Sequence, residues 1–585
     1  MSFSFFGIPV SHGITIGRAV VLATGSHEID HYYIESGQEA QELQRLINAK
    51  DAVLNDLQTL RQQLPKDTPA EVSAILEVHI IMLNDSTLAQ ELKRWIDERH
   101  YNAEWALDTQ LKALMRQFDD IEDDYLRQRK ADLEQLANRM QDMLARHKNG
   151  TTSALNELSS IPSADPLIMV AHDISPADML HFKQSVFTGF IADIGGKTSH
   201  SAIVARSLGI PALVGTRQAS QLIQQDDCII LDGNNGVAIV DPSPLILEEY
   251  QYRQRQHLIE NEKLNRLRYT PAITLDNQDI ELLANIETPE DAAKALDAGA
   301  AGVGLFRTEF LFMNHTGGQR KLPDEDEQYQ AYKTVLQAMP DHPVVIRTLD
   351  IGADKPLNHD EVKSNLNPAL GLRAIRWSLT EPDIFLVQLR ALLRAAVHGR
   401  LYILIPMLTH AWQIRQTLAL LARAKSSLQA QGIPCGQAQI GAMIEVPAAA
   451  LILPTFLHYF DFLSVGTNDL IQYTLAIDRA DESVAHLFDP LHPAILKLIA
   501  ETIAQSHASG KDICVCGEMA GDPAMTRLLL GLGLRSFSMH PSQILRVKQE
   551  LLHCDSKSLK PLAQALLNAQ TPEEQQNALQ ALQQA

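Results

Sequence analysis

The chain has 585 residues, which is too long for one compact core and predicts two to four domains. Its formal net charge of −21 argues against non-specific nucleic-acid binding, which needs a basic surface. Five cysteines without the spacing of a disulfide framework favour a reducing compartment. Apolar runs stay shorter than the roughly 18 residues of a membrane span. We therefore expect a cytoplasmic protein that neither binds nucleic acid nor inserts into a membrane.

The first part of the chain predicts an α/β domain that is interrupted by helices. β-Branched residues in 13–22 predict a strand. Within 36–147, apolar residues recur at steps of three and four, which predicts a helical bundle inserted after the first strands. Further strands are expected at 167–171, 186–192, 228–231 and 236–240. We assign residues 1–22 and 156–241 to the α/β domain, and 36–147 to the helical insert.

One histidine of this domain stands at an unusual place. The strand at 186–192 is followed by Gly195-Gly196 and then by Thr198 and Ser199, which can cap a helix. His200 is thus expected at a helix N-terminus, where backbone N–H groups and the helix dipole favour an anion. A neutral imidazole there can attack phosphorus and carry the phosphoryl group. Taken alone, His200 is better interpreted as a structural histidine in a strand–helix turn, and the residues of the second half of the chain reverse that preference.

The second half predicts a TIM barrel. Residues 242–270 contain a polar helical stretch bounded by prolines, which we interpret as a linker helix between two mobile halves. After it, helical patterns alternate with strands expected at 280–286, 302–306, 343–348, 401–405, 439–445, 460–465, 512–516 and 535–539. Eight such units predict a (β/α)8 barrel over residues 271–585.

Charged residues follow the predicted strands of the barrel, where the active sites of such barrels lie. Arg307, Arg347 and Arg479 suit a small, highly anionic ligand, because their planar guanidinium groups match phosphate and carboxylate oxygens. Glu445 and Asp469 offer the two hard oxygen ligands that a protein usually contributes to Mg²⁺. For any one of these residues, an ion pair that ties barrel loops together is an alternative interpretation.

Cys516 follows the seventh strand and offers a thiol as a proton donor. A metal site, several arginines and a proton donor at the ends of different strands form one coherent set. The set indicates phosphoryl transfer, because that reaction requires the protein to neutralise charge and to position the reacting groups.

Five motifs carry a resemblance that covers nearly the whole chain. They are Gly195-Gly-Lys-Thr-Ser-His200, Gly304-Leu-Phe-Arg-Thr-Glu-Phe-Leu-Phe-Met313, Arg347-Thr-Leu-Asp-Ile-Gly352, Ser464-Val-Gly-Thr-Asn-Asp-Leu470 and Cys516-Gly-Glu-Met-Ala-Gly521. With these motifs the chain resembles enzyme I of the bacterial phosphoenolpyruvate-dependent sugar phosphotransferase system. The resemblance implies a multidomain α/β protein with a swivelling phosphohistidine domain, an inserted helical bundle, a linker helix and a C-terminal TIM barrel.

The resemblance also implies roles for residues. His200 would take the phosphoryl group of phosphoenolpyruvate on Nε2 and pass it to a histidine of the phosphocarrier protein HPr. Glu445 and Asp469 would hold Mg²⁺, and Cys516 would protonate the departing enolpyruvate to give pyruvate. The helical insert would dock HPr, and the barrel would form a homodimer. The residues expected to bind phosphoenolpyruvate are Arg307, Arg347, Asn468, Asp469 and Arg479.

Two other functions are alternatives for a chain with these motifs. A phosphoenolpyruvate synthase or pyruvate, phosphate dikinase would share the swivelling domain and the barrel, but it needs an ATP-binding domain. Only residues 1–155 precede the phosphohistidine half, and they contain no glycine-rich nucleotide loop of the P-loop or dinucleotide type. A regulatory phosphorylation sensor without turnover is the second alternative, and the intact set of charged residues and Cys516 argues against it.

Overall fold

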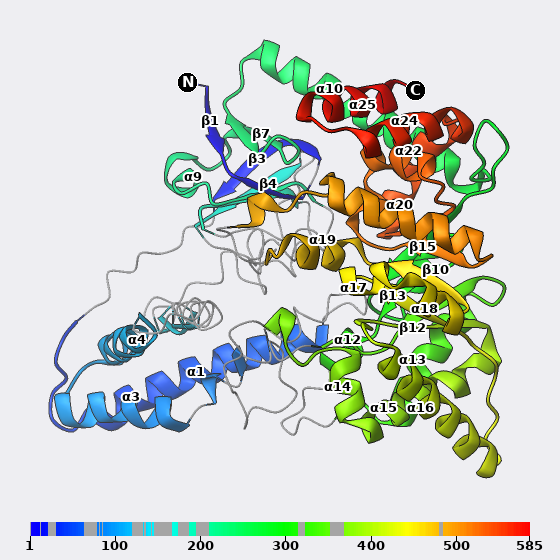
Figure 1. Ribbon diagram of the computed structural model, residues 1–585. Helices are drawn as coiled ribbons and strands as arrows, with labels where there is room; N and C mark the ends of the chain where they lie inside the picture. The colour runs from blue at the N-terminus through cyan, green and yellow to red at the C-terminus, as the bar shows by residue number, and fades with distance from the viewer. Residues whose placement is uncertain are drawn as a thin grey trace. The chain divides into compact units, whose positions relative to one another are not determined.

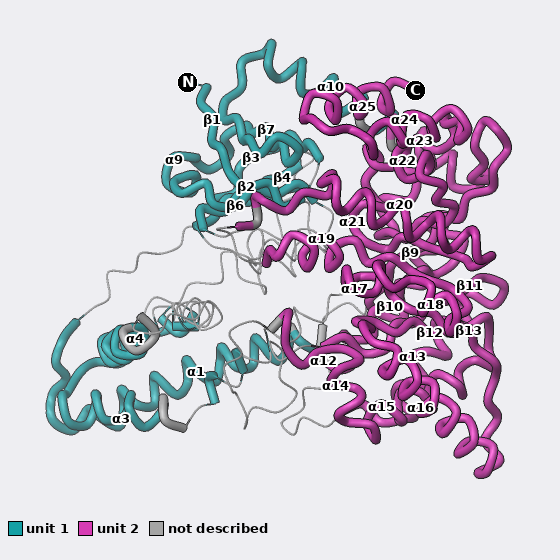
Figure 2. The backbone as a smooth tube through the Cα atoms, in the orientation of Figure 1, with its two compact units in different colours: residues 1–259 teal, residues 260–585 magenta. Residues whose placement is uncertain are grey.

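The structure is a computed structural model. It describes residues 2–11, 13–21, 31–63, 76, 79–80, 82–84, 86–119, 133, 136–137, 139–141, 143–144, 166–172, 187–194, 210–313, 322–351, 368–478 and 484–585. The chain divides into two compact units, residues 1–259 and residues 260–585, which Figure 2 colours separately. Each unit has hydrophobic clusters of its own.

The first unit contains an eight-stranded sheet in the order β1-β8-β7-β3-β4-β5-β6-β2 (Figure 1). The strands are β1 (Phe3–Phe6), β2 (Ile8–Ser11), β3 (Ile14–Val21), β4 (Leu167–Ala171), β5 (Phe187–Ala192), β6 (Ala212–Val214), β7 (Cys228–Asp232) and β8 (Val237–Val240). Strands β3 to β6 run parallel in neighbouring pairs. All five residues of β4 are buried, which explains its uninterrupted apolar sequence.

The four strands expected between 167 and 240 are confirmed, with bounds that shift by one residue at most. The N-terminal prediction was incomplete, because two short strands, β1 and β2, precede β3. Strand β6 was missed as well. Its three residues are too few to show a periodic pattern, and its place between β5 and β2 is set by pairing across the sheet.

Helices lie between β3 and β4 along the chain, where the sequence predicts a helical insert. They include α1 (Glu39–Gln63), α3 (Ser86–Arg99) and α4 (Ala103–Asp119), whose buried side chains form one cluster with Leu57 and Ile96 at less than 1% exposure. The helix α9 (Ala219–Leu222) follows β6. Most of the last part of the predicted helical insert, residues 121–147, lies outside the described residues.

A single long helix, α10 (Pro244–Arg266), follows β8. Proline at its first position fits the first turn, where an N–H group would have no partner within the helix. The boundary between the two units, at residues 259 and 260, falls within this helix. The chain therefore passes from one unit to the other as a helix.

The second unit is built on a closed barrel of eight parallel strands. The strands are β9 (Glu281–Ile286), β10 (Val303–Arg307), β11 (Pro343–Arg347), β12 (Arg400–Ile405), β13 (Gln439–Ile444), β14 (Phe462–Val465), β15 (Asp512–Val515) and β16 (Ser536–Met539). All eight expected strands are confirmed, and each end differs from its prediction by two residues at most. The barrel prediction is therefore correct.

Helices follow the strands of the barrel. They are α11 (Asp291–Asp297), α12 (Glu309–Met313), α13 (Glu325–Ala338), α14 (Ile375–Thr380), α15 (Pro382–Ala395), α16 (Ala411–Ala430), α17 (Pro447–Leu451), α18 (Leu453–Tyr459), α19 (Thr467–Leu475), α20 (Pro493–Ala508), α21 (Glu518–Gly521), α22 (Pro523–Gly531), α23 (Ile544–Leu552), α24 (Ser556–Asn568) and α25 (Pro572–Gln584). Among the residues that the structure describes, no helix is long and apolar enough to span a membrane.

Side chains fill the inside of the barrel. Leu305, Val345, Leu404, Met443, Phe462 and Cys516 form a buried cluster within it. Gly304 has no side chain because a Cβ atom there would lie 2.3 Å from the Ser538 hydroxyl oxygen. The barrel is thus a packed core, and its chemistry is confined to the rim at the carboxyl ends of the strands.

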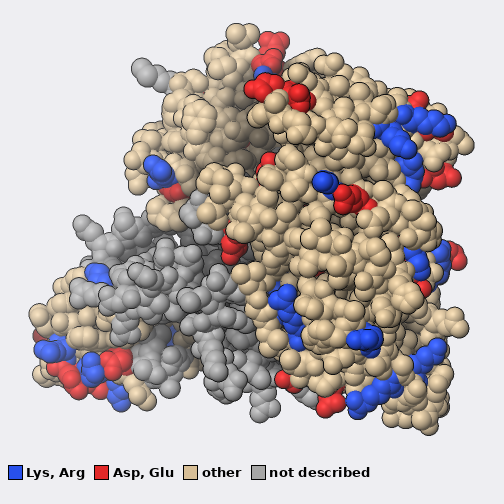
Figure 3. Space-filling model, in the orientation of Figure 1, with Lys and Arg blue, Asp and Glu red and all other residues tan. Residues whose placement is uncertain are grey.

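The surface carries charges of both signs. On the face drawn in Figure 3, acidic and basic side chains of the described residues lie in small mixed groups between broad uncharged areas. The net charge of −21 is therefore not gathered into one acidic patch among the described residues of that face.

A buried polar network fixes the ends of β10 and β11. The amide of Gln388, on α15, accepts from the Leu349 backbone N–H at 3.1 Å and donates to the hydroxyls of Thr308 and Tyr332 at 3.3 and 3.2 Å. Thr308 in turn donates to the Arg347 carbonyl at 2.9 Å. Because these groups are shielded from water, each depends on its protein partner.

We predict that Gln388→Ala lowers the free energy of unfolding by about 1–3 kcal/mol, because it leaves the buried Leu349 N–H without a partner. Urea unfolding of the full chain, followed by tryptophan fluorescence, measures the change. Gln429→Ala, on the exposed face of α16, is the matched control and should change stability by less than about 0.5 kcal/mol. Equal effects of the two variants would contradict the role given to the network.

Candidate functional site

The rim of the barrel gathers charged groups from several strands. Because all strands of a closed parallel barrel point the same way, the residues that follow them meet at one end. Glu445 follows β13, Asp469 lies in the first turn of α19, and Asp350 lies three residues beyond β11. One carboxylate oxygen from each of these three residues lies within 4.8 Å of the other two.

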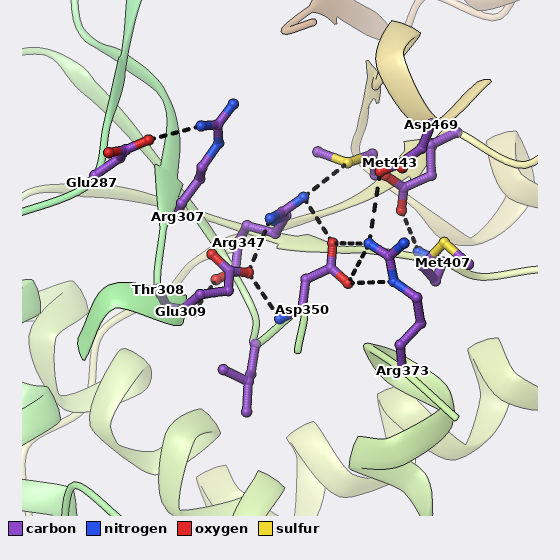
Figure 4. A network of polar contacts seen from close by, with 12 residues as sticks. Glu287, Arg307, Thr308, Glu309, Arg347, Asp350, Arg373, Met407, Met443 and Asp469 are labelled. Carbon is purple, nitrogen blue, oxygen red and sulfur yellow. Dashed lines mark hydrogen bonds and ion pairs between the residues drawn. The ribbon is translucent and has the colours of Figure 1, made fainter. Parts of the chain in front are cut away.

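Arg347, the last residue of β11, is the central cation (Figure 4). Its Nη2 lies 3.0 Å from Oε1 of Glu309, and its Nη1 lies 3.0 Å from Oδ2 of Asp350. Burial by itself would lower the pKa of Arg347, but Glu309 and Asp350 outweigh it and hold the pKa above its usual value. The guanidinium is therefore charged, and its buried Nε has no hydrogen-bond partner among the described residues.

A second arginine, Arg373, completes the cationic side of the rim. Its Nη2 lies 3.0 Å from both oxygens of Asp350 and 3.8 Å from Oδ2 of Asp469, and its Nη1 donates to Tyr473 at 3.1 Å. Burial raises the pKa of Tyr473 to about 12, against the opposing charge of Arg373, so this phenol stays neutral. Two guanidinium groups, whose side chains are 12% and 16% exposed, thus share Asp350.

Arg373 was not predicted as a site residue from the sequence. The residue follows a short turn, Pro368–Leu370, and precedes α14, so it does not stand at the end of a strand. The available signal was topological: the connection after β11 leaves from the same rim as the other site residues. Asp350 was visible in the motif that begins at Arg347, but it was not assigned as a metal ligand.

The three carboxylates fit a hard divalent cation. Oε1 of Glu445 accepts from the Met407 N–H at 2.6 Å, whereas its Oε2 is buried without a hydrogen-bond partner among the described residues. Burial and the nearby Asp469 and Asp350 raise the pKa of Glu445 to about 8. Clustered carboxylate oxygens with one oxygen lacking a partner are a suitable donor set for Mg²⁺.

Backbone strain marks the same rim. Met407 has φ 57° and Ala374 has φ 51°, a left-handed conformation that residues other than glycine adopt rarely. Met407 holds a Glu445 oxygen through its N–H, and Ala374 directly follows Arg373. Such strain persists when the surroundings dictate the conformation, and it clusters at functional sites.

Arg307 lies toward the outside of the rim. It ends β10, its side chain is 38% exposed, and its Nη1 donates to Oε1 of Glu287 at 2.9 Å. Figure 4 shows its guanidinium apart from the network around Asp350. The structure therefore places Arg307 at the rim but does not pair it with the same carboxylates as Arg347.

Asn468 lies in the first turn of α19, after β14, and Cys516 directly follows the neighbouring strand β15. The Asn468 amide donates to Oε1 of Glu518 at 3.0 Å and accepts from the Glu518 N–H at 3.0 Å, so both ends of the amide are oriented. Cys516 follows β15 and is 3% exposed. Burial raises the pKa of the Cys516 thiol, which is therefore protonated at neutral pH.

Two predicted site residues, His200 and Arg479, lie outside the described residues. The strand that leads toward His200 is described: β5 ends at Ala192, and the buried carboxylate of Asp193 follows it. Oδ1 of Asp193 accepts from the Thr216 hydroxyl at 3.0 Å, which anchors the start of the segment. Arg347, Glu445 and Asp469 are brought together by the barrel as expected.

Three family models match this chain. The PEP-utilising enzyme N-terminal model matches residues 6–129, the mobile-domain model matches 163–236, and the PEP-binding-domain model matches 261–556. A curated phosphoenolpyruvate-protein phosphotransferase from Cupriavidus necator is 56% identical over 100% of both chains. The chain belongs to the phosphoenolpyruvate-protein phosphotransferase family. Its reaction is therefore a phosphoryl transfer that uses phosphoenolpyruvate.

More distant members of the family agree. The phosphoenolpyruvate-protein phosphotransferase of Geobacillus stearothermophilus is 39% identical over 97% of this chain and 96% of its own. A solved structure titled as an NMR solution structure of Enzyme I is 26% identical over 43% of this chain and 99% of that one. Its TM-score of 0.36 is too low for the structure to add to the argument. Membership in the family favours phosphoenolpyruvate-dependent transfer over both alternative functions.

We predict that Glu445 makes the stability of the metal-free protein depend on pH. Its folded-state pKa of about 8 lies above the usual value of 4.5, so its favourable contribution is complete below pH 4.5 and is lost as pH rises through 8. In EDTA, the free energy of unfolding of the parent protein should fall relative to that of Glu445→Gln between pH 5 and pH 9. Urea unfolding at several pH values measures both. If the free energy of unfolding changed with pH in the same way in both proteins, the raised pKa of Glu445 would be contradicted.

Proposed function

We propose that this phosphotransferase moves the phosphoryl group of phosphoenolpyruvate to its own His200, and from there to a histidine of the phosphocarrier protein HPr. This is the first step of a bacterial sugar phosphotransferase system. The observation that carries the proposal is the barrel rim, where the largely shielded guanidinium groups of Arg347 and Arg373 adjoin three clustered carboxylates. Such a rim suits a small ligand that bears both a phosphate and a carboxylate.

The arginines and Asn468 have positioning roles in this proposal. Arg307, Arg347 and Arg479 neutralise the anionic groups of phosphoenolpyruvate, and the oriented amide of Asn468 donates to one of its oxygens. Phosphoryl transfer requires charge neutralisation and alignment more than covalent help from the protein. The guanidinium groups at the ends of β10 and β11 support this assignment, because the strands fix where their charges lie.

Glu445 and Asp469 would hold the Mg²⁺ ion, which when bound supplies charge neutralisation for the transferring group. The buried Oε2 of Glu445 and the grouping with Asp350 support this choice. Asp469 would also contact phosphoenolpyruvate. Cys516 would give its thiol proton to C3 of enolpyruvate, so that pyruvate leaves the site.

The domain assignment follows from these roles. We propose a phosphohistidine domain in residues 1–22 and 156–241, a helical HPr-docking insert in 36–147, a linker helix in 242–270, and a substrate-binding barrel in 271–585. The mobile-domain model that matches 163–236, the segment that contains His200, supports the swivelling role. The curated relatives are named as protein phosphotransferases, which supports a protein acceptor.

We also propose that the protein acts in the cytoplasm as a homodimer formed through the barrel. Large apolar side chains on the barrel unit support an interface of this kind, since Trp412 and Leu451 are about half or more exposed in the single chain.

The experiment that tests the function uses phosphoenolpyruvate labelled in its phosphoryl group, with Mg²⁺ and without nucleotide. The protein should acquire acid-labile, alkali-stable label, and His200→Ala should acquire none while still binding phosphoenolpyruvate, because substrate binds to the barrel. His553→Ala, on the surface of the barrel unit, is the control and should label normally. Label that persists in His200→Ala, or that requires ATP, would contradict the proposal.

We predict that Arg307→Lys lowers kcat/KM for phosphoenolpyruvate by about 10- to 100-fold. The lysine keeps the charge but loses the planar fork that can hold two oxygens of one phosphate, at the cost of roughly one charged hydrogen bond. Steady-state kinetics measures the change, with Arg423→Lys on the exposed face of α16 as the control. Unchanged kinetics in Arg307→Lys would remove this residue from the site.

A further inference from the structure

The thiol of Cys516 is held in a defined orientation. The residue lies among the apolar side chains that fill the barrel, and its sulfur has two polar contacts. The Ser464 hydroxyl on β14 donates to the sulfur at 3.2 Å, and the thiol faces the Val465 carbonyl oxygen at 3.5 Å. Strands β14 and β15 are paired neighbours, so the backbone ladder sets these distances.

Ser464 itself is an unusual residue for this place. It is 1% exposed, and the cluster beside it consists of Leu305, Val345, Leu404, Met443 and Phe462 together with Cys516. A hydroxyl in such surroundings is costly unless it has a hydrogen-bond partner. The sulfur of Cys516 is the partner that the structure provides.

We propose that Ser464 is a positioning residue for the proton donor: its hydroxyl orients the Cys516 sulfur and stabilises the thiolate that remains after the proton has left. This inference rests on the proposed function, because it takes Cys516 as the donor to enolpyruvate. Burial raises the pKa of the thiol, and the Ser464 hydroxyl opposes that rise.

The proton transfer from Cys516 to enolpyruvate breaks one bond and forms another. The S–H bond of Cys516 breaks, and a C–H bond forms at C3 of the enolate of pyruvate. The electron pair for the new bond comes from the enolate double bond, and the C2 oxygen becomes a carbonyl. Sulfur keeps the electrons of the S–H bond as a thiolate, to which the Ser464 hydroxyl continues to donate, and water later returns the proton. A hydrogen bond to an ionised group is stronger than one to a neutral group, so Ser464 favours the product side of the transfer.

A purely structural role for Ser464 makes a different prediction. Alanine differs from serine by one oxygen atom, so Ser464→Ala keeps the packing of the barrel nearly intact. If the hydroxyl only filled space, its removal would change stability slightly and leave every chemical step alone. If it acts on the sulfur, its removal slows the protonation step specifically.

The test follows the exchange of pyruvate methyl hydrogens with deuterated solvent, in full-length protein with Mg²⁺, by NMR. Ser464→Ala should slow this exchange by about 10- to 100-fold, which corresponds to the loss of one hydrogen bond to a charged group. KM for phosphoenolpyruvate should stay within about twofold, and delivery of phosphoryl from preloaded protein to HPr should be unchanged. Ser506→Ala, a fully buried serine that donates within α20, is the matched control.

An infrared measurement gives a second readout that does not depend on activity. The S–H stretching band of Cys516, identified by subtracting the spectrum of Cys516→Ala, should shift in Ser464→Ala because the sulfur loses a hydrogen-bond donor. It should not shift in Ser506→Ala. An unchanged band together with unchanged exchange in Ser464→Ala would overturn the proposal while leaving the proposed function intact. If Cys516→Ala itself exchanged pyruvate hydrogens at the parental rate, the assigned role of Cys516 would fail, and the role of Ser464 with it.

Discussion

The barrel rim depends on one shared carboxylate. Asp350 is 1% exposed at its side chain and pairs with both Arg347 and Arg373 at 3.0 Å (Figure 4). Two guanidinium groups taken out of water are costly, and only close pairing with good geometry offsets that cost. Without Asp350, the two cations would repel each other across the rim. The other charges of the site are arranged around this pairing.

Burial and two neighbouring carboxylates, opposed by Arg347 and Arg373, explain why Glu445 holds a proton so firmly. Asp350 and Asp469 lie close to it, and burial already disfavours a third negative charge. A divalent cation bound here would relieve both effects, because it would replace the proton and attract all three carboxylates. The net charge of the site that the arginines face would then be more positive, since the metal brings more charge than the proton it displaces. Metal binding at this rim would therefore favour anion binding through ordinary electrostatics.

Much of the fold was predictable, because each barrel strand is a short apolar run with a helical pattern after it. The rule that strand ends meet at one rim then brought Glu445 and Asp469 together correctly. Residues that reach the site from irregular connections were not predictable in this way. Arg373 was missed because its position depends on the path of a loop and on the left-handed backbone of Ala374. The roles of His200 and Arg479 stay predictions from motif and resemblance, since both lie outside the described residues.

The division of the chain into two units has a chemical reason. A rim lined by buried arginines and carboxylates is suited to a small, multiply charged ligand, because every charge can find a fixed partner. A histidine on the surface of another protein brings no such set of charges, and a protein surface cannot enter a packed barrel. In the proposed function, a carrier imidazole on a separate unit would remove this conflict, since it would take up the phosphoryl group at the rim and deliver it elsewhere. Different residues would then serve substrate binding and protein recognition, and the helix α10, which joins the two units along the chain, would have to permit the movement.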